Sequence, residues 1–248
     1  MSRVAIVTGG SSGMGEATAR LLAKKGWRVA IVFSKDRNRA DDVARQCGAL
    51  AVQGNVAEDA DCRRVARDVL AKWGRIDGLV NNAGTTKFVA HKDLEGLSAA
   101  DFETIFRVNL IGPFQMIRAC ENALREAKGS IVNISSVAHL LGTGSSIAYA
   151  ASKAALNTMS FSLARALGPE VRVNIVSPGY VRTPWQIAAK GEEGSREDES
   201  RYAAKAPLGA AAQAEDVAEA IVWLLEGARR VTGEILYVDG GMHIASPR

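Results

Sequence analysis

The stretch that decides the fold is Thr8–Gly15, TGGSSGMG, which follows an apolar run from Val4 and precedes an amphipathic segment. Glycines let a chain turn tightly between a strand and a helix, and they let the backbone approach a ligand closely. The N-terminus of the helix offers free N–H groups and a positive dipole end, which suit a phosphate. The spacing is not G-x-G-x-x-G, and no Gly-Lys-Ser/Thr follows as in a P-loop. The stretch predicts a dinucleotide-binding turn, with a purely structural glycine loop as the alternative.

Short apolar runs alternate with longer amphipathic stretches along the rest of the chain. Most runs are β-branched and apolar at successive positions, as in strands buried on both faces of a sheet. This alternation predicts right-handed βαβ units and an α/β fold with a three-layer, doubly wound parallel sheet of about seven strands. The expected strands are Val4–Gly9, Arg28–Phe33, Ala49–Gly54, Ile76–Gly84, Ser130–Ser136, Val171–Gly179 and Glu234–Gly241, and the clear helices are Glu16–Gly26, Asp59–Gly74, Asp101–Ala127, Ala148–Leu167 and Ala214–Glu226.

No linker, repeat or low-complexity tract divides the sequence, so we expect one domain over residues 1–248. The segment Trp185–Lys205 differs from the rest because it is polar, rich in charges of both signs and without a strong period. A long segment of this kind is usually a functional lid or a disordered loop. We expect a substrate lid around residues 184–206.

The composition is that of an ordinary soluble globular protein, with 47% hydrophobic and 23% charged residues. No apolar run reaches the roughly 18 residues of a membrane span, and the N-terminus has no signal-peptide pattern. The cysteines, Cys47, Cys62 and Cys120, lack metal-ligand spacing, and no acidic cluster suggests a metal. The net charge of +4 is spread along the chain without a basic stripe. We expect a cytoplasmic protein with reduced thiols that binds no membrane, nucleic acid or metal.

Tyr149 and Lys153, in YAASK, lie four residues apart and would share one face of a helix. A free tyrosine titrates near pH 10, which makes it a poor acid or base at neutrality. A nearby cation stabilises the phenolate and lowers the tyrosine pKa toward the pH at which acid–base catalysis is most effective. Taken alone, the pair is more typical of a helix surface than of a catalytic site.

Ser136 ends an expected strand thirteen residues before Tyr149, and the carboxyl ends of parallel strands are where open sheets bind ligands. Ser135 has the same chemistry, but successive strand residues point to opposite faces, so only one of the two serines should reach the site. Asn109 is a polar residue within an apolar helical stretch. It is either part of the same site or a satisfied core amide.

Together, T-G-x-x-x-G-x-G at the first turn, N-N-A-G at Asn81–Gly84 and Y-x-x-x-K at Tyr149 resemble the short-chain dehydrogenase/reductase family. The resemblance covers nearly the whole chain, from Val4 to Gly241. It implies an NAD(P)-dependent oxidoreductase on a Rossmann-type sheet, most often a homotetramer. Its substrate would be a small carbonyl compound or secondary alcohol.

The resemblance also implies a role for each catalytic residue. Tyr149 would donate its proton to a carbonyl oxygen in reduction and accept it in the reverse direction. Ser136 would hydrogen-bond that oxygen, and Lys153 would hold the nicotinamide ribose and acidify Tyr149. Asn109 would order a water that links Lys153 to solvent.

A fold that selects NAD usually carries a carboxylate at the end of the second strand. Here Phe33 occupies that position, and Ser34, Lys35, Asp36 and Arg37 follow it. Hydroxyl, ammonium and guanidinium groups favour the 2′-phosphate of NADP through charge-assisted hydrogen bonds. A longer strand would bring the Asp36 carboxylate into contact, so NAD remains the alternative.

After the third strand the family usually has Asp-Val, whereas this chain has Asn55-Val56. An amide oxygen can still accept from the adenine amine. With this departure, the resemblance assigns the cofactor contacts to Gly9, Ser11, Ser12, Gly13, Met14, Gly15, Ser34, Lys35, Asn55, Val56, Asn82, Ala83, Gly84, Tyr149, Lys153, Pro178, Gly179, Val181 and Thr183.

Three loops, Thr85–Ser98, Val137–Ile147 and Tyr180–Lys205, are expected to contact the substrate. A small polar carbonyl, a steroid and an acyl thioester fit them equally well. A 3-oxoacyl thioester (acyl carrier protein) reductase is therefore an alternative, and a catalytically silent dinucleotide sensor is a second, disfavoured because all four catalytic positions are present. The side chains of note in these loops are His91, His139, Leu140, Leu141, Trp185 and Gln186.

Overall fold

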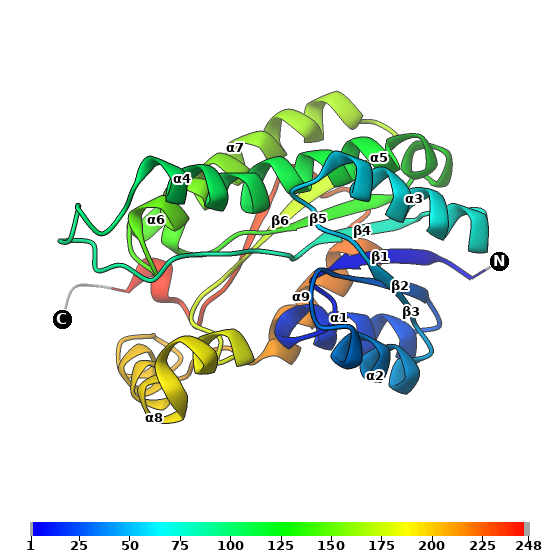
Figure 1. Ribbon diagram of the computed structural model, residues 1–248. Coiled ribbons are helices and arrows are strands. Elements are labelled where there is room, and N and C mark those ends of the chain that lie inside the picture. The colour runs from blue at the N-terminus through cyan, green and yellow to red at the C-terminus, as the bar shows by residue number, and fades with distance from the viewer. Residues whose placement is uncertain (1, 246–248) are drawn as a thin grey trace.

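The computed structural model describes residues 2–245, which form a single parallel sheet covered by helices on both faces (Figure 1). The strand order is β3-β2-β1-β4-β5-β6-β7, so the chain moves outward from β1 and then restarts at β4 on its other side. The expected doubly wound sheet of seven strands is confirmed. The strands are β1 (Val4–Thr8), β2 (Arg28–Phe33), β3 (Leu50–Gln53), β4 (Gly78–Asn81), β5 (Ser130–Ile134), β6 (Arg172–Pro178) and β7 (Ile235–Val238).

Alternate residues of each strand enter two separate apolar cores, one on each side of the sheet. In β1, Ala5 and Val7 pack in the core under α1, α2 and α9, whereas Val4 and Ile6 pack in the core under α3, α5 and α7. All four side chains are completely buried, as expected for a central strand. The helices are α1 (Gly13–Lys24), α2 (Arg37–Cys47), α3 (Asp59–Trp73), α4 (Ala99–Phe106), α5 (Gly112–Ala127), α6 (Ala138–Leu141), α7 (Ile147–Leu167), α8 (Pro184–Ala203) and α9 (Ala214–Glu226).

The helical pattern differs from the expectation in several places. Neither α2 nor the short α6 is among the helices expected from the sequence, and the few apolar residues of α2 lie on one narrow stripe. The single helix expected over 101–127 is divided by a π-helical turn, Arg107–Ile111, between α4 and α5. Such turns are rare and frequently lie at functional sites, and this one contains Asn109.

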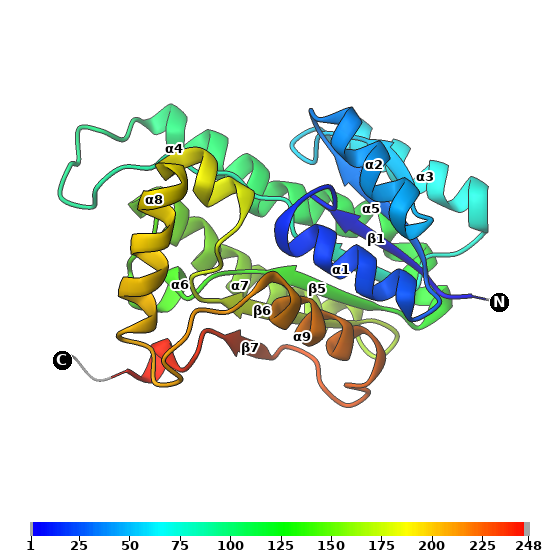
Figure 2. The same ribbon diagram turned by 90° about the horizontal axis from the view of Figure 1, so that it is seen from below.

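The charged segment expected to be a lid or a disordered loop forms α8. Its backbone leaves helical geometry at Gly191, where φ is 75° and ψ is 171°, so the segment is two helical pieces joined at a bend. The bend and the exposure of most of its residues explain why the sequence shows no continuous helical period. Figure 2 shows α8 apart from the two helical layers, beside the end of the sheet where the strands finish.

Within residues 2–245, no helix is long and apolar enough to cross a membrane. The same residues contain no group of three histidine, cysteine or acidic side chains that could hold a metal ion.

A buried carboxylate joins the two central strands. Asp77 Oδ2 accepts hydrogen bonds from the backbone N–H of Val4 at 2.8 Å and from Arg75 Nε at 2.9 Å, while Oδ1 accepts from Arg75 Nη2 at 2.5 Å. The residue is only 7% exposed. Because unpaired buried donors are expensive, this carboxylate contributes to the position of β4 beside β1.

We predict that Asp77→Ala lowers the free energy of unfolding by about 2–3 kcal/mol, because it leaves the Val4 N–H and the Arg75 guanidinium without their acceptor. Urea denaturation measures the change. Asp68→Ala is the control, since Asp68 pairs with arginines on the exposed face of α3. That variant should change stability by less than about 0.5 kcal/mol. Equal losses in the two variants would contradict the proposed role of Asp77.

Candidate active site

The glycine-rich turn places α1 directly against the end of β1. Gly9 and Gly13 have φ of 64° and 52°, in the left-handed region that favours glycine. Gly15 permits the closest approach, because a Cβ there would lie 2.3 Å from the carbonyl oxygen of Gly9. Any larger residue at Gly15 would push the helix away from the strand.

The first turn of α1 leaves its donors available to a ligand. The backbone N–H of Glu16 bonds to the Ser12 carbonyl at 3.1 Å, so the N–H groups of Gly13, Met14 and Gly15 precede the first bond within the helix. The Ser12 side chain does not cap the helix. A helix N-terminus of this kind, bare and lined by glycine, fits the pyrophosphate of a dinucleotide.

Thr8 and Asn82 fix the turn from below. Thr8 Oγ1 accepts from the N–H groups of Asn82 and Ala83, both at 3.0 Å, and Asn82 Nδ2 donates to the carbonyls of Thr8 and Gly9. The Asn82 side chain, expected to contact a cofactor, therefore supports the loop that would hold it. In the sequence, Thr8 is recognisable only as the first residue of the glycine-rich motif. The hydrogen bonds of its side chain show why this position carries a hydroxyl group.

On the opposite side of the turn, Thr183 closes the site. Its methyl group lies 3.1 Å from the position that a Cβ on Gly13 would take. Pro178, Gly179 and Val181 lead from β6 to this threonine and line the same cavity. The structure thus brings the expected contacts after β6 together with the glycine turn.

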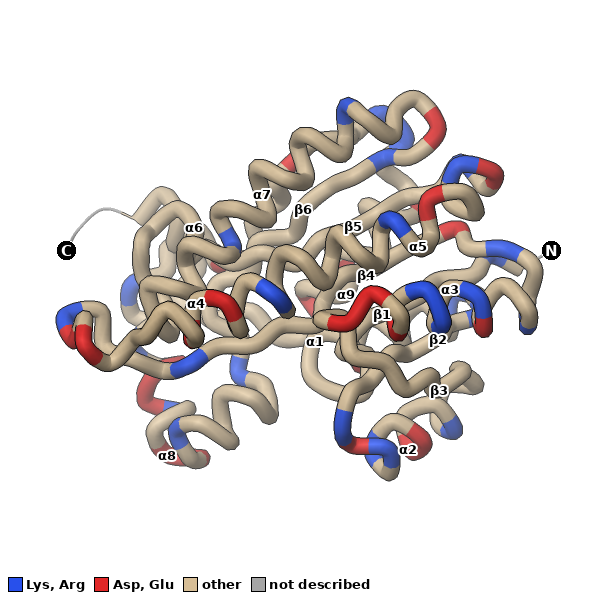
Figure 3. The backbone as a smooth tube through the Cα atoms, turned by 45° about the horizontal axis from the view of Figure 1, so that its top comes forward, with Lys and Arg blue, Asp and Glu red and all other residues tan. Residues whose placement is uncertain are grey.

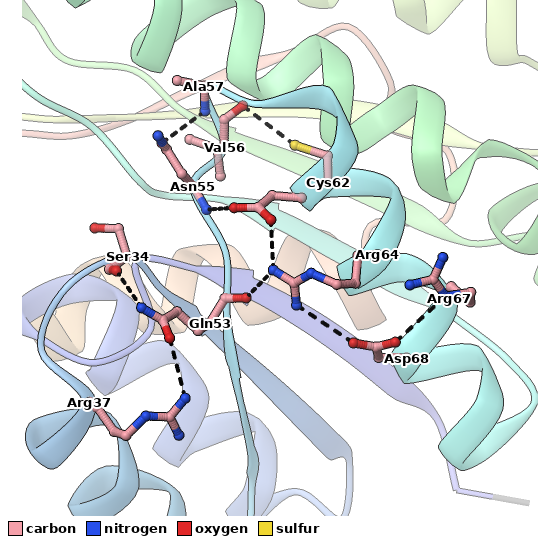
Figure 4. Close-up of polar contacts among 11 residues, drawn as sticks. Ser34, Arg37, Gln53, Asn55, Val56, Ala57, Cys62, Arg64, Arg67 and Asp68 are labelled. Atoms are coloured by element: carbon pink, nitrogen blue, oxygen red, sulfur yellow. Dashed lines mark hydrogen bonds and ion pairs between the residues drawn. The ribbon is translucent and has the colours of Figure 1, made fainter.

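The expected adenosine end lies where β2 and β3 finish (Figure 4). β2 ends at Phe33, and Asp36 caps α2 by accepting from the N–H of Arg39 at 3.0 Å. Gln53 links this loop to β3, since it donates to the Ser34 carbonyl at 3.2 Å and accepts from Arg37 at 3.3 Å. The Ser34 and Lys35 side chains are exposed.

Asn55 and Val56 follow β3, as expected. The Asn55 side-chain oxygen accepts from the N–H of Ala57 at 3.1 Å, and its backbone N–H donates to Asp61 at 2.9 Å. The Val56 carbonyl accepts from Gln115 Nε2 at 2.8 Å and is also contacted by the Cys62 thiol. The Asn55 oxygen therefore keeps one lone pair for a ligand.

Tyr149 is fixed at the start of α7. Its backbone N–H donates to the side chain of Ser146, the N-cap residue, at 3.3 Å. Its phenol hydrogen-bonds Ser136, and Lys153 Nζ lies 5.6 Å from the centre of its ring. The Ser135 hydroxyl instead donates to the Lys153 carbonyl at 3.4 Å. The structure thus places Ser136 rather than Ser135 beside the phenol.

Lys153 is almost completely buried, and its ammonium donates to the Ile134 carbonyl at 2.8 Å. Asn109 lies close by, since a Cβ added to Gly84 would be 3.5 Å from Asn109 Oδ1 and 3.8 Å from Lys153 Nζ. The Asn109 amide bonds both backbone groups of Thr85 and also donates to Ser152 at 3.0 Å. Four side chains from three separate segments of the chain therefore meet in one place: Asn109 of the π-helical turn, Ser136 after β5, and Tyr149 and Lys153 of α7.

Comparison with known proteins identifies this arrangement. A family model described as Enoyl-(acyl carrier protein) reductase matches residues 9–243. The chain is 37% identical to the candidate ketoacyl reductase 2 of the granaticin polyketide synthase of Streptomyces violaceoruber, over 97% of this chain and 96% of that one. It is 33% identical to the 3-oxoacyl-[acyl-carrier-protein] reductase of Rattus norvegicus, over 99% and 100%. A candidate short-chain dehydrogenase/reductase from Burkholderia xenovorans superposes with a TM-score of 0.89 at 39% identity, over 98% and 99%.

The chain belongs to the short-chain dehydrogenase/reductase family. It is therefore an oxidoreductase of a family that binds nicotinamide cofactors. The sequence resemblance is confirmed over the whole described fold.

One expectation about this dehydrogenase/reductase site is wrong for the protein without ligand. Lys153 was expected to lower the Tyr149 pKa, but burial raises the pKa of the phenol to about 12, and the hydrogen bond with Ser136 only partly opposes this. Burial also lowers the pKa of Lys153 to about 8. Both shifts have one cause, because moving either charged form out of water is unfavourable.

A cavity of about 690 Å³ opens above Tyr149 and Ser136. Its wall includes Met14 and Thr183 on the cofactor side, and Phe88 and Trp185 on the outer side. Phe88 is not among the side chains expected at the site, because the sequence shows only that it lies in the loop Thr85–Ser98 and no motif includes it. Six side chains of the substrate loops stand out in the sequence. Within residues 2–245, only Trp185 and Gln186 of these six belong to the cavity wall, and the other four do not: His91, His139, Leu140 and Leu141.

His139 has partners within the protein instead. Its Nδ1 lies 2.6 Å from the Ser136 carbonyl oxygen, and its Nε2 lies 3.3 Å from the Tyr237 hydroxyl. The ring also stacks on Tyr237. His139 therefore supports the peptide of Ser136 from behind the cavity.

The depressed pKa of Lys153 predicts a pH dependence of stability. Between about pH 8 and its unfolded pKa of 10.5, the unfolded chain carries a proton that the folded chain has released. The free energy of unfolding should therefore rise with pH in this window, by about 3 kcal/mol relative to Lys153→Met. Urea denaturation at several pH values measures the difference. Lys92→Met, in an exposed loop, is the control, and a wild-type curve parallel to that of Lys153→Met would contradict the burial effect.

Proposed function

We propose that the protein is an NADP-preferring oxidoreductase that interconverts a small-molecule carbonyl compound and a secondary alcohol, with Tyr149 as general acid and base. The observation that carries the proposal is the position of the Tyr149 phenol. It touches Ser136, lies beside Lys153 and faces a cavity that also contains Met14 of the glycine turn. A proton donor and the expected cofactor site thus border the same space.

The reaction needs a proton on the substrate oxygen and a hydride at the substrate carbon. The nicotinamide, when bound, supplies or accepts the hydride. Tyr149 donates the proton to the oxygen in reduction and removes it in oxidation, while the Ser136 hydroxyl donates a hydrogen bond that holds the oxygen.

Lys153 is held for two tasks in this proposal. Its ammonium is anchored on the Ile134 carbonyl, within reach of the ribose hydroxyls expected beside Gly84. A positive charge there also favours the phenolate once Tyr149 gives up its proton. Asn109 positions Thr85 and Ser152 next to this lysine, and we propose that it orders the water through which Lys153 exchanges protons with solvent.

The preference for NADP rests on the loop after β2. Because β2 ends at Phe33 and the Asp36 carboxylate caps α2, that carboxylate is directed toward the helix. Ser34 and Lys35 are exposed at the strand end, with the N-terminus of α2 behind them. These groups favour a 2′-phosphate over a free ribose hydroxyl.

A 3-oxoacyl thioester is the second candidate substrate. It is supported by the ketoacyl and 3-oxoacyl reductases among the relatives and by the cavity volume of about 690 Å³. A cytoplasmic homotetramer is the assembly that we expect by family likeness. The exposed apolar side chains of Ile111, Phe114 and Trp223 support contacts with further copies.

Tyr149→Phe should reduce kcat by at least about a thousandfold, because the proton donor is lost, while NADPH still binds. The decrease of NADPH absorbance with a ketone measures turnover, and fluorescence titration measures binding. A variant that retains a near-normal rate would rule out this mechanism.

The wild-type protein should use NADPH with a kcat/KM at least about tenfold above that for NADH. Ser34→Asp should reverse the order, because a carboxylate at the end of β2 repels the 2′-phosphate and accepts from the ribose hydroxyls. Asp68→Asn, on the exposed face of α3, is the control and should leave the ratio of the two cofactors unchanged. A wild-type preference for NADH would refute the NADP proposal.

A further inference from the structure

A row of aromatic side chains leads from the reactive phenol to the rim of the cavity. The ring centres of Tyr149 and Trp185 are 6.2 Å apart, and those of Trp185 and Phe88 are 5.8 Å apart. The ammonium of Lys190 lies 5.6 Å above the Phe88 ring. Trp185 and Phe88 are 41% and 38% exposed. Large apolar side chains left accessible in a cavity usually mark the place of a ligand.

The charges of α8 and the residues after it are divided between two sides. Between residues 184 and 206 there are four cations and five carboxylates, and Figure 3 shows both signs along α8. Three of the cations, Lys190, Arg201 and Lys205, line the cavity, but only one carboxylate, Asp198, does so. The segment is acidic as a whole, yet its cavity side is positive.

Two of the other carboxylates pair with a cation that does not line the cavity. Arg182 pairs with Glu192 and lies 4.0 Å from Glu199. Asp198 alone faces Lys190 and Arg201, pairing with the first and lying 2.5 Å from the second. One carboxylate between two cations leaves a net positive charge at the rim, and Lys205 adds to it.

Resting on the proposed function, we infer that the substrate is an anionic ketone whose apolar body lies along Trp185 and Phe88 and whose negative group binds Lys190. The carbonyl stands at Tyr149, and the chain beyond it follows the aromatic row. Lys190 terminates this path, with Arg201 and Lys205 beside it. A positive rim also attracts an anionic substrate, repels a cationic ketone of the same shape and gives an uncharged ketone no such gain.

Two sources could provide this anion: a carboxylate that belongs to the substrate, or the phosphate of a carrier arm bound to an acyl group. Both make the same charge-assisted contact with an ammonium. The two anions differ in their distance from the carbonyl carbon. Free oxo acids of increasing chain length, compared with their methyl esters, measure that distance.

The quantity to measure is the ratio of kcat/KM for each straight-chain oxo acid to that for its methyl ester, with NADPH. In the wild type the acid should be preferred, most strongly at the chain length that reaches Lys190. Lys190→Gln should lower the best ratio about tenfold. Asp198→Asn should raise it, because it removes the carboxylate that competes for Lys190.

Arg196→Gln is the matched control. Arg196 belongs to the same helix but does not line the cavity, so the acid-to-ester ratio should stay at the wild-type value. A ratio that Lys190→Gln leaves unchanged would overturn the inference and leave the proposed function intact. A rise in the KM for NADPH without a change in the ratio would also overturn it, by assigning Lys190 to the cofactor. A third result distinguishes the two sources of the anion. If the wild type does not prefer the free acids over their esters, but Lys190→Gln binds an acyl pantetheine phosphate more weakly than the wild type does, the anion is the phosphate of a carrier arm.

Binding separates this inference from a failure of the proposed reaction. Calorimetry with the Tyr149→Phe protein and NADP compares the oxo acid with its ester, without turnover. Tighter binding of the acid, lost in Tyr149→Phe/Lys190→Gln, supports the anion contact even if no ketone is reduced. Equal affinities for acid and ester would contradict it.

Discussion

The site depends on the close approach of α1 to the end of β1. With 2.3 Å between the position of a Cβ on Gly15 and the Gly9 carbonyl, only glycine fits, and the helix therefore begins directly above the strand. Asn82 then ties the turn to the end of β4, where the direction of chain connection reverses. Ligands of open α/β sheets bind at such a reversal. The packing of one backbone against another thus determines where the proposed cofactor site and the proposed catalytic cluster meet.

Burial has opposite effects on the two titratable groups of that cluster. It raises the pKa of Tyr149 to about 12 and lowers that of Lys153 to about 8. Near neutral pH the site therefore holds a protonated phenol beside an ammonium whose proton is less firmly held than that of a free lysine. In the proposed reaction, the charge distribution around the bound substrate and cofactor would have to stabilise the charged forms. The same burial that makes ionisation unfavourable also strengthens each hydrogen bond within the site.

The sequence predicts those features that depend on periodicity and on local motifs. The order of strands and helices follows from apolar runs, and the glycine turn and Tyr149–Lys153 follow from residue types at fixed spacing. The π-helical turn at Asn109 could not be predicted, because it depends on how α4 and α5 pack rather than on a local signal. The capping role of Asp36 required the end of β2 to be known to within a residue. The aromatic row from Tyr149 to Phe88 joins three separate segments, which only the folded chain brings together.

Transfer of deuterium from an alcohol to the cofactor tests the proposed reaction most directly. A secondary alcohol that carries deuterium on its carbinol carbon is incubated with the protein and NADP, and the reduced cofactor is analysed by mass spectrometry. The wild type should transfer the deuterium to the nicotinamide ring, and Tyr149→Phe, which lacks the base for the hydroxyl proton, should transfer almost none. Deuterium found in the solvent, or equal transfer by both proteins, would contradict hydride transfer assisted by Tyr149.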